Sequence, residues 1–333
     1  MAWGEARDAE AGEGLMEPYI SFIAVGRNDG YGGDFLGRTN AFLECLLSFV
    51  EGLGVVSELI LVEWAPPADR SRLKDALTWP RVTRKHCAIR IIEVPPSVHA
   101  IIPNPGKLPL LEYIGKNVGA RRARGEYFLT TNPDVLFNRS LIEFLTAKRL
   151  SPSCYYRIDR CDLRAPVPAA ASAEDLMAFC RRNVIQIHGL YYTYPNTWRD
   201  RLKLALDFRT RRHLRRKDAP LPVPHVNASG DFFLAHRDAW CRIRGFAEFE
   251  RQGGPHHIDL LMVLSVLYGG WQQVILEPPL RLYHQDHARP EVAKPWSGAV
   301  ETAFKQLRKT RQAMVFNDER WGLGDQSLPE TSL

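Results

Sequence analysis

Residues 116–134 read KNVGARRARGEYFLTTNPD, a segment that joins a helix, a strand and a polar turn. Apolar residues at helical spacing run through 110–124, and Gly125 follows them as the residue type that commonly ends a helix. Residues 127–131 form a short apolar run typical of a buried strand, and three turn formers come directly after it, at 132–134. We therefore expect a helix that feeds a buried strand, with polar groups at the carboxyl end of that strand.

The residues before this segment repeat the same alternation of strands and helices. The pattern predicts buried strands at 19–25, 58–64 and 87–94, with helices at 35–51 and 69–77. Strands that alternate with helices form mostly parallel sheets covered on both faces. The predicted fold class is therefore α/β, a mostly parallel sheet flanked by helices.

The second half of the chain is less regular, and residues 162–224 contain many prolines. The pattern predicts helices at 237–243 and 260–268, with strands at 273–276 and 280–284. We expect a flexible leader at 1–16, a nucleotide-binding half at 17–150, an acceptor half at 151–290 with a basic insertion at 195–220, and a tail or lid at 291–333.

Charge and composition narrow the class of protein. The net charge is +6, and much of the excess lies in the basic run 199–217. Such a run suits an anionic membrane or an acidic acceptor, or it is a solvated loop. Only Phe208 is interleaved with the arginines, so base stacking and specific binding of nucleic acid are not expected.

Neither a membrane span nor a secretion signal is visible. No stretch approaches the roughly 20 apolar residues that cross a bilayer, and the first residues are acidic. The six cysteines are scattered without a Cys-x-x-Cys pair, which predicts reduced thiols. We expect a cytoplasmic protein, with peripheral binding to a membrane as the alternative.

Polar groups follow several of the predicted strands. They are the turn Arg27-Asn28-Asp29, then Glu63, then Asn132 with Asp134. Ligands of parallel sheets bind at the carboxyl ends of strands, so these groups indicate a site. A carboxylate there can hold the divalent cation that neutralises a departing diphosphate. An ordinary strand-to-helix turn is the alternative for 132–134.

Segment 116–134 resembles the GT-A glycosyltransferases, especially the large family-2-like group. In that group an Asn-x-Gly and a closing Ala-x-Gly on a helix precede a strand that ends in Asp-x-Asp. This chain has Asn117 and Gly125 in those motifs, and Asn132 replaces the first acid of the last one. The resemblance implies that Asp134 binds the metal and the diphosphate, and that Asn132 faces the ribose or the sugar.

The same resemblance implies a nucleotide site in the first half of the chain. It places the base and ribose at Arg27, Asn28 and Asp29, and it implies that Glu63 accepts a hydrogen bond from uracil N3. Lys116 would approach the phosphates. Near the end of the chain Trp321 is either a lid over the nucleotide or a packing residue.

Segment 232–261 resembles the carboxyl-terminal catalytic region of β-1,4-galactosyltransferases and polypeptide N-acetylgalactosaminyltransferases. There a Gly-Phe turn and a Gly-rich loop precede an acidic motif that opens a helix, and 245–246, 253–254 and Asp259 follow that pattern. The resemblance implies that Asp259 is the base that activates the acceptor, while its position also suits a helix N-cap. His257 is the alternative base, and Asp231 is a candidate for holding a sugar.

The third match is His284-Gln285-Asp286-His287. In several GT-A families a histidine after the last core strand completes the metal site, which implies His284 or His287, with His284 preferred because it ends a strand. Imidazole suits Mn²⁺ better than Mg²⁺, which stays the alternative ion.

The predicted reaction is transfer of a sugar from a nucleoside diphosphate sugar, with UDP as the expected nucleotide, to a hydroxyl of a glycan, lipid-linked or other acceptor, with inversion. One alternative is a nucleotidyltransferase, although the expected Gly-rich loop with Arg and Lys is missing after the first strand. The other is a non-catalytic module that binds nucleotide sugars or polyanions.

Overall fold

The computed structural model describes residues 17–82, 85–105, 107–164, 166–189, 193–195, 198–199, 224–253, 256–288 and 298–333. The predicted leader and nearly all of the basic run lie outside these residues, so neither prediction is tested. Among the described residues, no helix is long and apolar enough to cross a membrane. The six cysteines all lie in the described residues, and none of them forms a disulfide.

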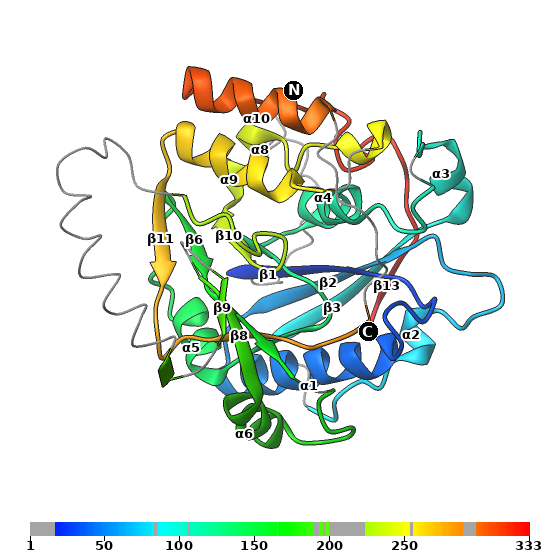
Figure 1. Ribbon diagram of the computed structural model, residues 1–333. Helices are drawn as coiled ribbons and strands as arrows, with labels where there is room; N and C mark the ends of the chain where they lie inside the picture. Colours follow the sequence, from blue (N-terminus) through cyan, green and yellow to red (C-terminus); the bar gives the residue numbers. More distant parts are fainter. Residues whose placement is uncertain are drawn as a thin grey trace.

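An eight-stranded sheet forms the centre of the molecule, in the order β11-β6-β10-β4-β1-β2-β3-β13 (Figure 1). Pairing is parallel between β4 and β1, β1 and β2, β2 and β3, and β11 and β6. The α/β class, with a mostly parallel sheet flanked by helices, is confirmed. The strands are β1 (Ile20–Gly26), β2 (Ser57–Trp64), β3 (Cys87–Val94), β4 (Tyr127–Thr130), β6 (Cys154–Ile158), β10 (Phe233–His236), β11 (Gln272–Leu276) and β13 (Glu330–Ser332).

Helices cover both faces of this sheet. In Figure 1 one group lies above it and contains α4 (Glu112–Arg122), α8 (Arg237–Ile243), α9 (Ile258–Tyr268) and α10 (Gly298–Thr310). The other group lies below it and contains α1 (Phe35–Leu53), α5 (Arg139–Thr146) and α6 (Ala173–Asn183). The described residues also form three short helices, α2 (Leu73–Ala76), α3 (Pro96–Ile101) and the 3₁₀ helix η1 (Phe249–Gln252).

The alternation of side chains along β1 explains the two layers. Phe22 and Ala24 pack into the core on the α1 side, whereas Ile23 and Val25 pack into the core on the α4 side. A strand with helices on both faces buries nearly every side chain, and this is why β1 reads as an apolar run interrupted only by Ser21. Gly119 of α4 lets the helix lie close to β1, because a Cβ there would come within 2.4 Å of Ile23 Cγ2.

A second sheet packs beside the first and was not predicted. Its order is β5-β12-β7-β8-β9. The sequence predicted a less regular second half, and of the strands in this sheet it predicted only the one at 280–284. These strands are short and all but the one at 135–137 carry polar residues, so their sequence shows little periodicity. They are β5 (Val135–Phe137), β12 (Leu282–His284), β7 (Arg160–Leu163), β8 (Val184–His188) and β9 (Thr193–Pro195).

Three helix boundaries differ from prediction. The helix α4 ends at Arg122, and Gly125 instead donates its N–H to Ser21 Oγ at 2.8 Å. The helix predicted at 69–77 is reduced to the four residues of α2, because Glu63 rather than a helical partner receives the N–H of Leu73. The N-cap of α9 is His257, so Asp259 lies inside the first turn and is not the cap.

Glu250 stabilises the start of α4 from a distant part of the chain. Its carboxylate is buried and accepts the N–H of Tyr113 at 3.2 Å and of Ile114 at 2.9 Å. These donors favour the charged form, but burial is the larger effect and raises the pKa of Glu250 from 4.5 to about 8.

The free energy of unfolding is expected to fall between about pH 5 and pH 8, by up to about 1.4 kcal/mol per pH unit from this group. The raised pKa means that folded Glu250 keeps a proton that the unfolded chain releases. Its contribution is complete below the unfolded pKa and is lost as the pH rises through the folded one. Glu250→Gln should flatten this dependence in urea unfolding curves recorded across that range. Equal slopes for both proteins would contradict the assignment.

Candidate functional site

Asp134, His284 and His287 converge at the carboxyl end of β4, where a metal site was predicted. Their ligand atoms all lie within 4.8 Å of one another. Asp134 Oδ2 is 3.8 Å from His284 Nε2 and 3.3 Å from His287 Nε2. The strands hold them in place, since β5 pairs with β12 and the N–H of Gln285 donates to the Asp134 carbonyl at 3.0 Å.

Both imidazoles face the carboxylate with the same ring nitrogen. His287 Nδ1 is 3.0 Å from the Ala288 carbonyl, and His284 Nδ1 is 3.5 Å from Asp162 Oδ1. Each Nδ1 thus faces an oxygen acceptor, from which we infer that the proton sits on Nδ1 and the lone pair on Nε2. Two Nε2 lone pairs and a carboxylate oxygen then point toward one place.

These residues fit a divalent transition metal. The distances from Asp134 Oδ2 to the two imidazole nitrogens, 3.8 and 3.3 Å, fit atoms that each lie about 2.0–2.2 Å from one ion. Asp134 Oδ1 is buried without a hydrogen-bond partner. Burial lowers the pKa of His284, against the opposing effect of Asp134, and a neutral imidazole is the form that binds metal.

Asp231 lies beside this cluster, at the start of β10, and both of its oxygens are engaged. Oδ2 is 2.6 Å from Arg160 Nη1, and Oδ1 accepts from Asn132 Nδ2 at 2.8 Å. Burial would raise the pKa of Asp231, but Arg160 and His284 outweigh it and lower the pKa to about 2. Asp231 is therefore a permanent anion and a weak proton acceptor at neutral pH. Asn132 faces Asp231 here, and its predicted contact with a ribose or sugar stays a prediction.

Asp259 supports the loop that carries Asp231. Its Oδ2 accepts the N–H of Gly230 at 2.9 Å and lies 2.7 Å from Ser229 Oγ. Ser229 Oγ is also 2.8 Å from the Val226 carbonyl, so its one proton serves a single acceptor at a time. Both contacts of Asp259 fall on the same oxygen. Its role as a base, and that of the half-buried His257, remain predictions.

Lys116 binds this same loop from the other side. It is fully buried, and Nζ donates to the Gly230 carbonyl at 2.8 Å and pairs with Glu112 Oε1 at 2.5 Å. The charge of Lys116 is therefore already compensated within the protein. Contact with phosphates stays a prediction for this residue.

The predicted nucleotide residues come together at the ends of β1 and β2. Arg27 pairs with Asp29 at 3.0 Å, and its Nε donates to the Ala65 carbonyl at 3.0 Å. The side chain of Asn28 donates to the Ser71 carbonyl at 2.9 Å. Glu63 points inward: it is 1% exposed and accepts the N–H of Leu73. Burial raises the pKa of Glu63 to about 7. Recognition of uracil by Glu63 stays a prediction.

Trp321 lies in the core rather than over the site. It is 4% exposed, and the Arg121 guanidinium lies 5.5 Å from the centre of its ring. The neighbouring Gly322 N–H donates to Glu248 Oε1 at 2.7 Å. The burial of Trp321 fits the packing alternative, and its role as a lid stays a prediction.

The two motifs that suggested glycosyltransferases meet in space. Asn117 Oδ1 accepts the N–H of Phe246, and its Nδ2 donates to the Phe246 carbonyl, both at 2.8 Å. Gly245 has a φ of 72°, and a Cβ there would lie 2.2 Å from Asn117 Oδ1. Asn117 and the Gly-Phe turn thus dock α4 against the segment before η1.

Sequence reasoning missed four polar residues of this site, which are Arg157, Arg160, Asp162 and His188. Arg157 is fully buried, donates to the carbonyls of His225 and Asn227, and has no hydrogen-bond partner at Nη1. Burial lowers its pKa to about 10. Only two features of the sequence could have indicated these residues. One is the arginine within the apolar run 154–158, and the other is the polar residues at alternate positions of β7.

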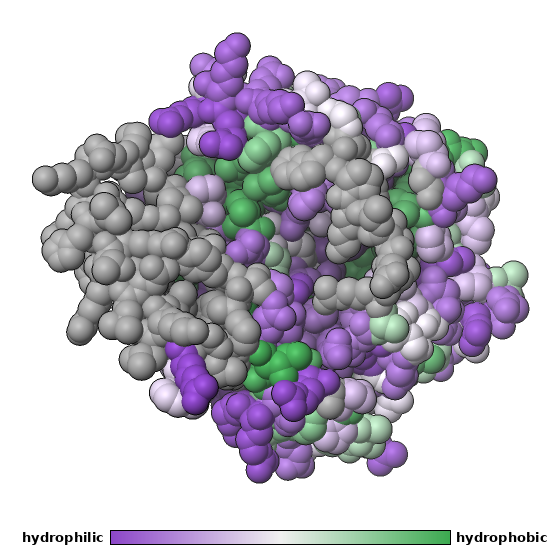
Figure 2. Space-filling view, viewed as in Figure 1, coloured by the Kyte–Doolittle hydropathy of each residue, from purple (hydrophilic) through white to green (hydrophobic). Residues whose placement is uncertain are grey.

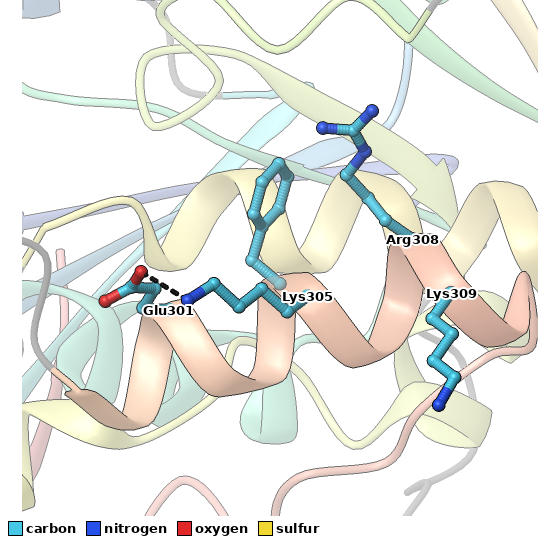
Figure 3. Close-up of a pocket in the computed structure, with 5 residues that line it drawn as sticks. Glu301, Lys305, Arg308 and Lys309 are labelled. Carbon is cyan, nitrogen blue, oxygen red and sulfur yellow. Dashed lines mark ion pairs between the residues drawn. The ribbon is translucent and has the colours of Figure 1, made fainter.

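A surface pocket on α10 lacks the cluster of buried carboxylates and imidazoles that forms the candidate site. It is lined by Glu301, Phe304, Lys305, Arg308 and Lys309, all from α10 (Figure 3). Glu301 and Lys305 form an exposed pair at 2.7 Å. Figure 2 shows that hydrophilic residues cover much of the face seen there, so such exposed charged pairs need no ligand to explain them.

No family model matches the chain, and no curated protein matches it. The chain is similar to solved structures of S. aureus TarS. One TarS structure has a TM-score of 0.41 and 11% identity, with 81% of this chain and 37% of that chain covered. Residues 1–349 of TarS in complex with UDP-GlcNAc have a TM-score of 0.42 and 11% identity, with 88% and 65% covered. The same residues with UDP have a TM-score of 0.38 and 12% identity, with 81% and 61% covered.

This chain therefore spans well under two thirds of the length of the first TarS structure. The function proposed below rests on the side chains of the site.

Proposed function

We propose that this protein is a GT-A-type glycosyltransferase that moves a sugar from a UDP-sugar to an acceptor hydroxyl, with inversion. The observation that carries the proposal is the cluster of Asp134, His284 and His287 at the carboxyl end of β4. It lies at the edge of the sheet where parallel α/β folds bind ligands. The predicted nucleotide residues Arg27 and Asp29 lie at the end of the adjacent strand β1.

A divalent cation, with Mn²⁺ favoured over Mg²⁺ by the two imidazoles, would be held by these three residues. When bound, it would neutralise the charge that develops on the departing diphosphate. Asp259 removes the proton of the acceptor hydroxyl. Arg160 and Asn132 each bind one oxygen of Asp231. A carboxylate has about four acceptor sites, so Asp231 would use the remaining ones to hold a sugar hydroxyl rather than act as a base.

The acceptor is a glycan, a lipid-linked sugar or another hydroxyl compound, and the basic run 199–217 would attract an acidic one. A non-catalytic binding module is the second candidate, because Asn132 stands where metal-dependent relatives of the proposed type have an acid. Release of the nucleoside diphosphate, UDP or GDP, from a panel of UDP-sugars and GDP-sugars with Mn²⁺ separates the two. A binding module would retain its ligand unchanged.

UDP is expected to raise the melting temperature more than GDP or ADP does, and more with Mn²⁺ than without it. A ligand that binds only the folded state stabilises it by about RT ln(1 + [L]/Kd), or roughly 2.7 kcal/mol at a hundred times Kd. A thermal-shift screen of the three diphosphates, with Mn²⁺ or with chelator, measures this. Equal increases in melting temperature with all three diphosphates would contradict the recognition of uracil.

A further inference from the structure

Asp162 contacts three charged or ionisable groups and was assigned no role by the sequence. Its Oδ1 is 3.5 Å from His284 Nδ1 and 2.8 Å from Arg160 Nε. Its Oδ2 is 2.9 Å from His188 Nε2. The side chain is 16% exposed, so these neighbours and not solvent surround most of it. Asp162 therefore lies directly behind a ring that faces Asp134 from its other side.

The register of the second sheet places these groups together. Strands β7 and β12 are parallel with Asp162 opposite His284, and β8 pairs with β7 so that Arg160 lies opposite His188. Arg160 and Asp162 are two residues apart on one strand, so their side chains share a face. The contacts of Asp162 are thus made from three adjacent strands and not from a mobile loop.

We propose that Asp162 is a positioning residue for the metal centre, which holds His284 in the orientation and tautomer that bind the ion. Asp162 Oδ1 lies 3.5 Å from His284 Nδ1 and has no hydrogen bond of its own, so its charge favours the tautomer that carries the proton on Nδ1 and leaves the Nε2 lone pair directed toward Asp134. A carboxylate behind a metal-bound imidazole fixes the ring and makes it a stronger ligand. The inference rests on the metal centre of the proposed function, and not on the sugar or the acceptor.

Arg160 and His188 hold Asp162 itself. With Arg160 on one side and His188 on the other, the carboxylate cannot rotate away from His284 without losing both contacts. Arg160 also binds Asp231, so one guanidinium links the metal centre to the loop supported by Asp259. Loss of Asp162 should therefore loosen the ring of His284 while the protein stays folded.

The test is the affinity for Mn²⁺ alone, measured by electron paramagnetic resonance of the free ion in a titration. Asp162→Asn keeps the shape but presents an amide, and it should weaken Mn²⁺ binding by about 10–100-fold, the range found for such supporting residues. Asp159→Asn is the matched control. It removes an acid that pairs with another histidine, His225 Nε2 at 2.8 Å, three residues earlier in the chain. This control should bind Mn²⁺ as the wild type does.

Wild-type affinity in Asp162→Asn would overturn the proposal, as would an equal loss in Asp159→Asn. Circular dichroism shows whether each variant is folded. If Asp162→Asn does not fold, His188→Gln replaces it, because it loosens Asp162 without touching a ligand. Unchanged Mn²⁺ affinity in that variant would also overturn the proposal.

Other results test the proposed function independently of the role of Asp162. Mn²⁺ binding by the wild type, with no stabilisation by any nucleoside diphosphate, would reject the glycosyltransferase and leave the role of Asp162 standing. No Mn²⁺ binding by the wild type would reject the metal centre and Asp162 together. Stabilisation by UDP in the presence of chelator would show that the nucleotide site exists without the ion.

Discussion

Asp259→Asn is expected to lower the rate of sugar transfer by at least about a hundredfold, while UDP binding and folding stay normal. A hydroxyl is a poor nucleophile until its proton has an acceptor, and a positioned base contributes roughly 10²–10⁴-fold. The two contacts of Asp259 both fall on Oδ2, so a single amide oxygen can replace it toward Gly230 and Ser229. The variant thus keeps the loop and loses the base.

The matched control for this variant is Asp238→Asn. Asp238 occupies the same place in the first turn of α8 that Asp259 occupies in α9, but its side chain is 70% exposed and it pairs with His236. It removes the same charge from a helix start and should leave transfer unchanged. Transfer by Asp259→Asn at nearly the wild-type rate would move the role of base to His257. Asp231 is the weaker substitute because Arg160 and Asn132 occupy its oxygens.

Failure of Asp259→Asn to fold would identify support of the Gly230 loop as its main role. Equilibrium unfolding in urea, compared with the wild type, distinguishes this outcome from a loss of catalysis.

Asp134→Ala is expected to abolish Mn²⁺-dependent binding of UDP and to leave the fold intact. The carboxylate is the only acid of the three-residue cluster, and its Oδ1 has no hydrogen bond to lose. His284→Ala should weaken binding less, because Asp134 and His287 remain. Calorimetric titration of UDP with and without Mn²⁺ measures both variants.

Asp286→Ala is the control for the metal variants. Asp286 lies between the two histidines in sequence, but it is exposed and is not part of the cluster. It should bind UDP as the wild type does. If a chelator leaves wild-type turnover unchanged, the ion has no role and Asp134 acts in another way.

The local sequence determined the long helices and the central parallel strands of the first half. Buried parallel strands must be apolar on both faces, and so β1, β2 and β3 are visible as short runs ended by glycine or proline. It also predicted that Asp134 and His284 belong to one site, since each stands at the end or the start of a strand, and the structure brings them together with His287. The place where a strand begins or ends depends on residues close to it in sequence, and the hydrophobic pattern shows these residues directly.

Tertiary structure alone decided which polar groups are available. Glu63 and Asp231 were both expected to contact a ligand. In the structure the carboxylate of Glu63 accepts the N–H of Leu73, and the carboxylate of Asp231 accepts from Arg160 and Asn132. The second sheet brings Asp162 behind His284 across 122 residues of sequence, a pairing set by register between strands and not by local pattern. Burial and hydrogen bonding to distant residues fix the charge and orientation of such groups, and a linear sequence contains neither.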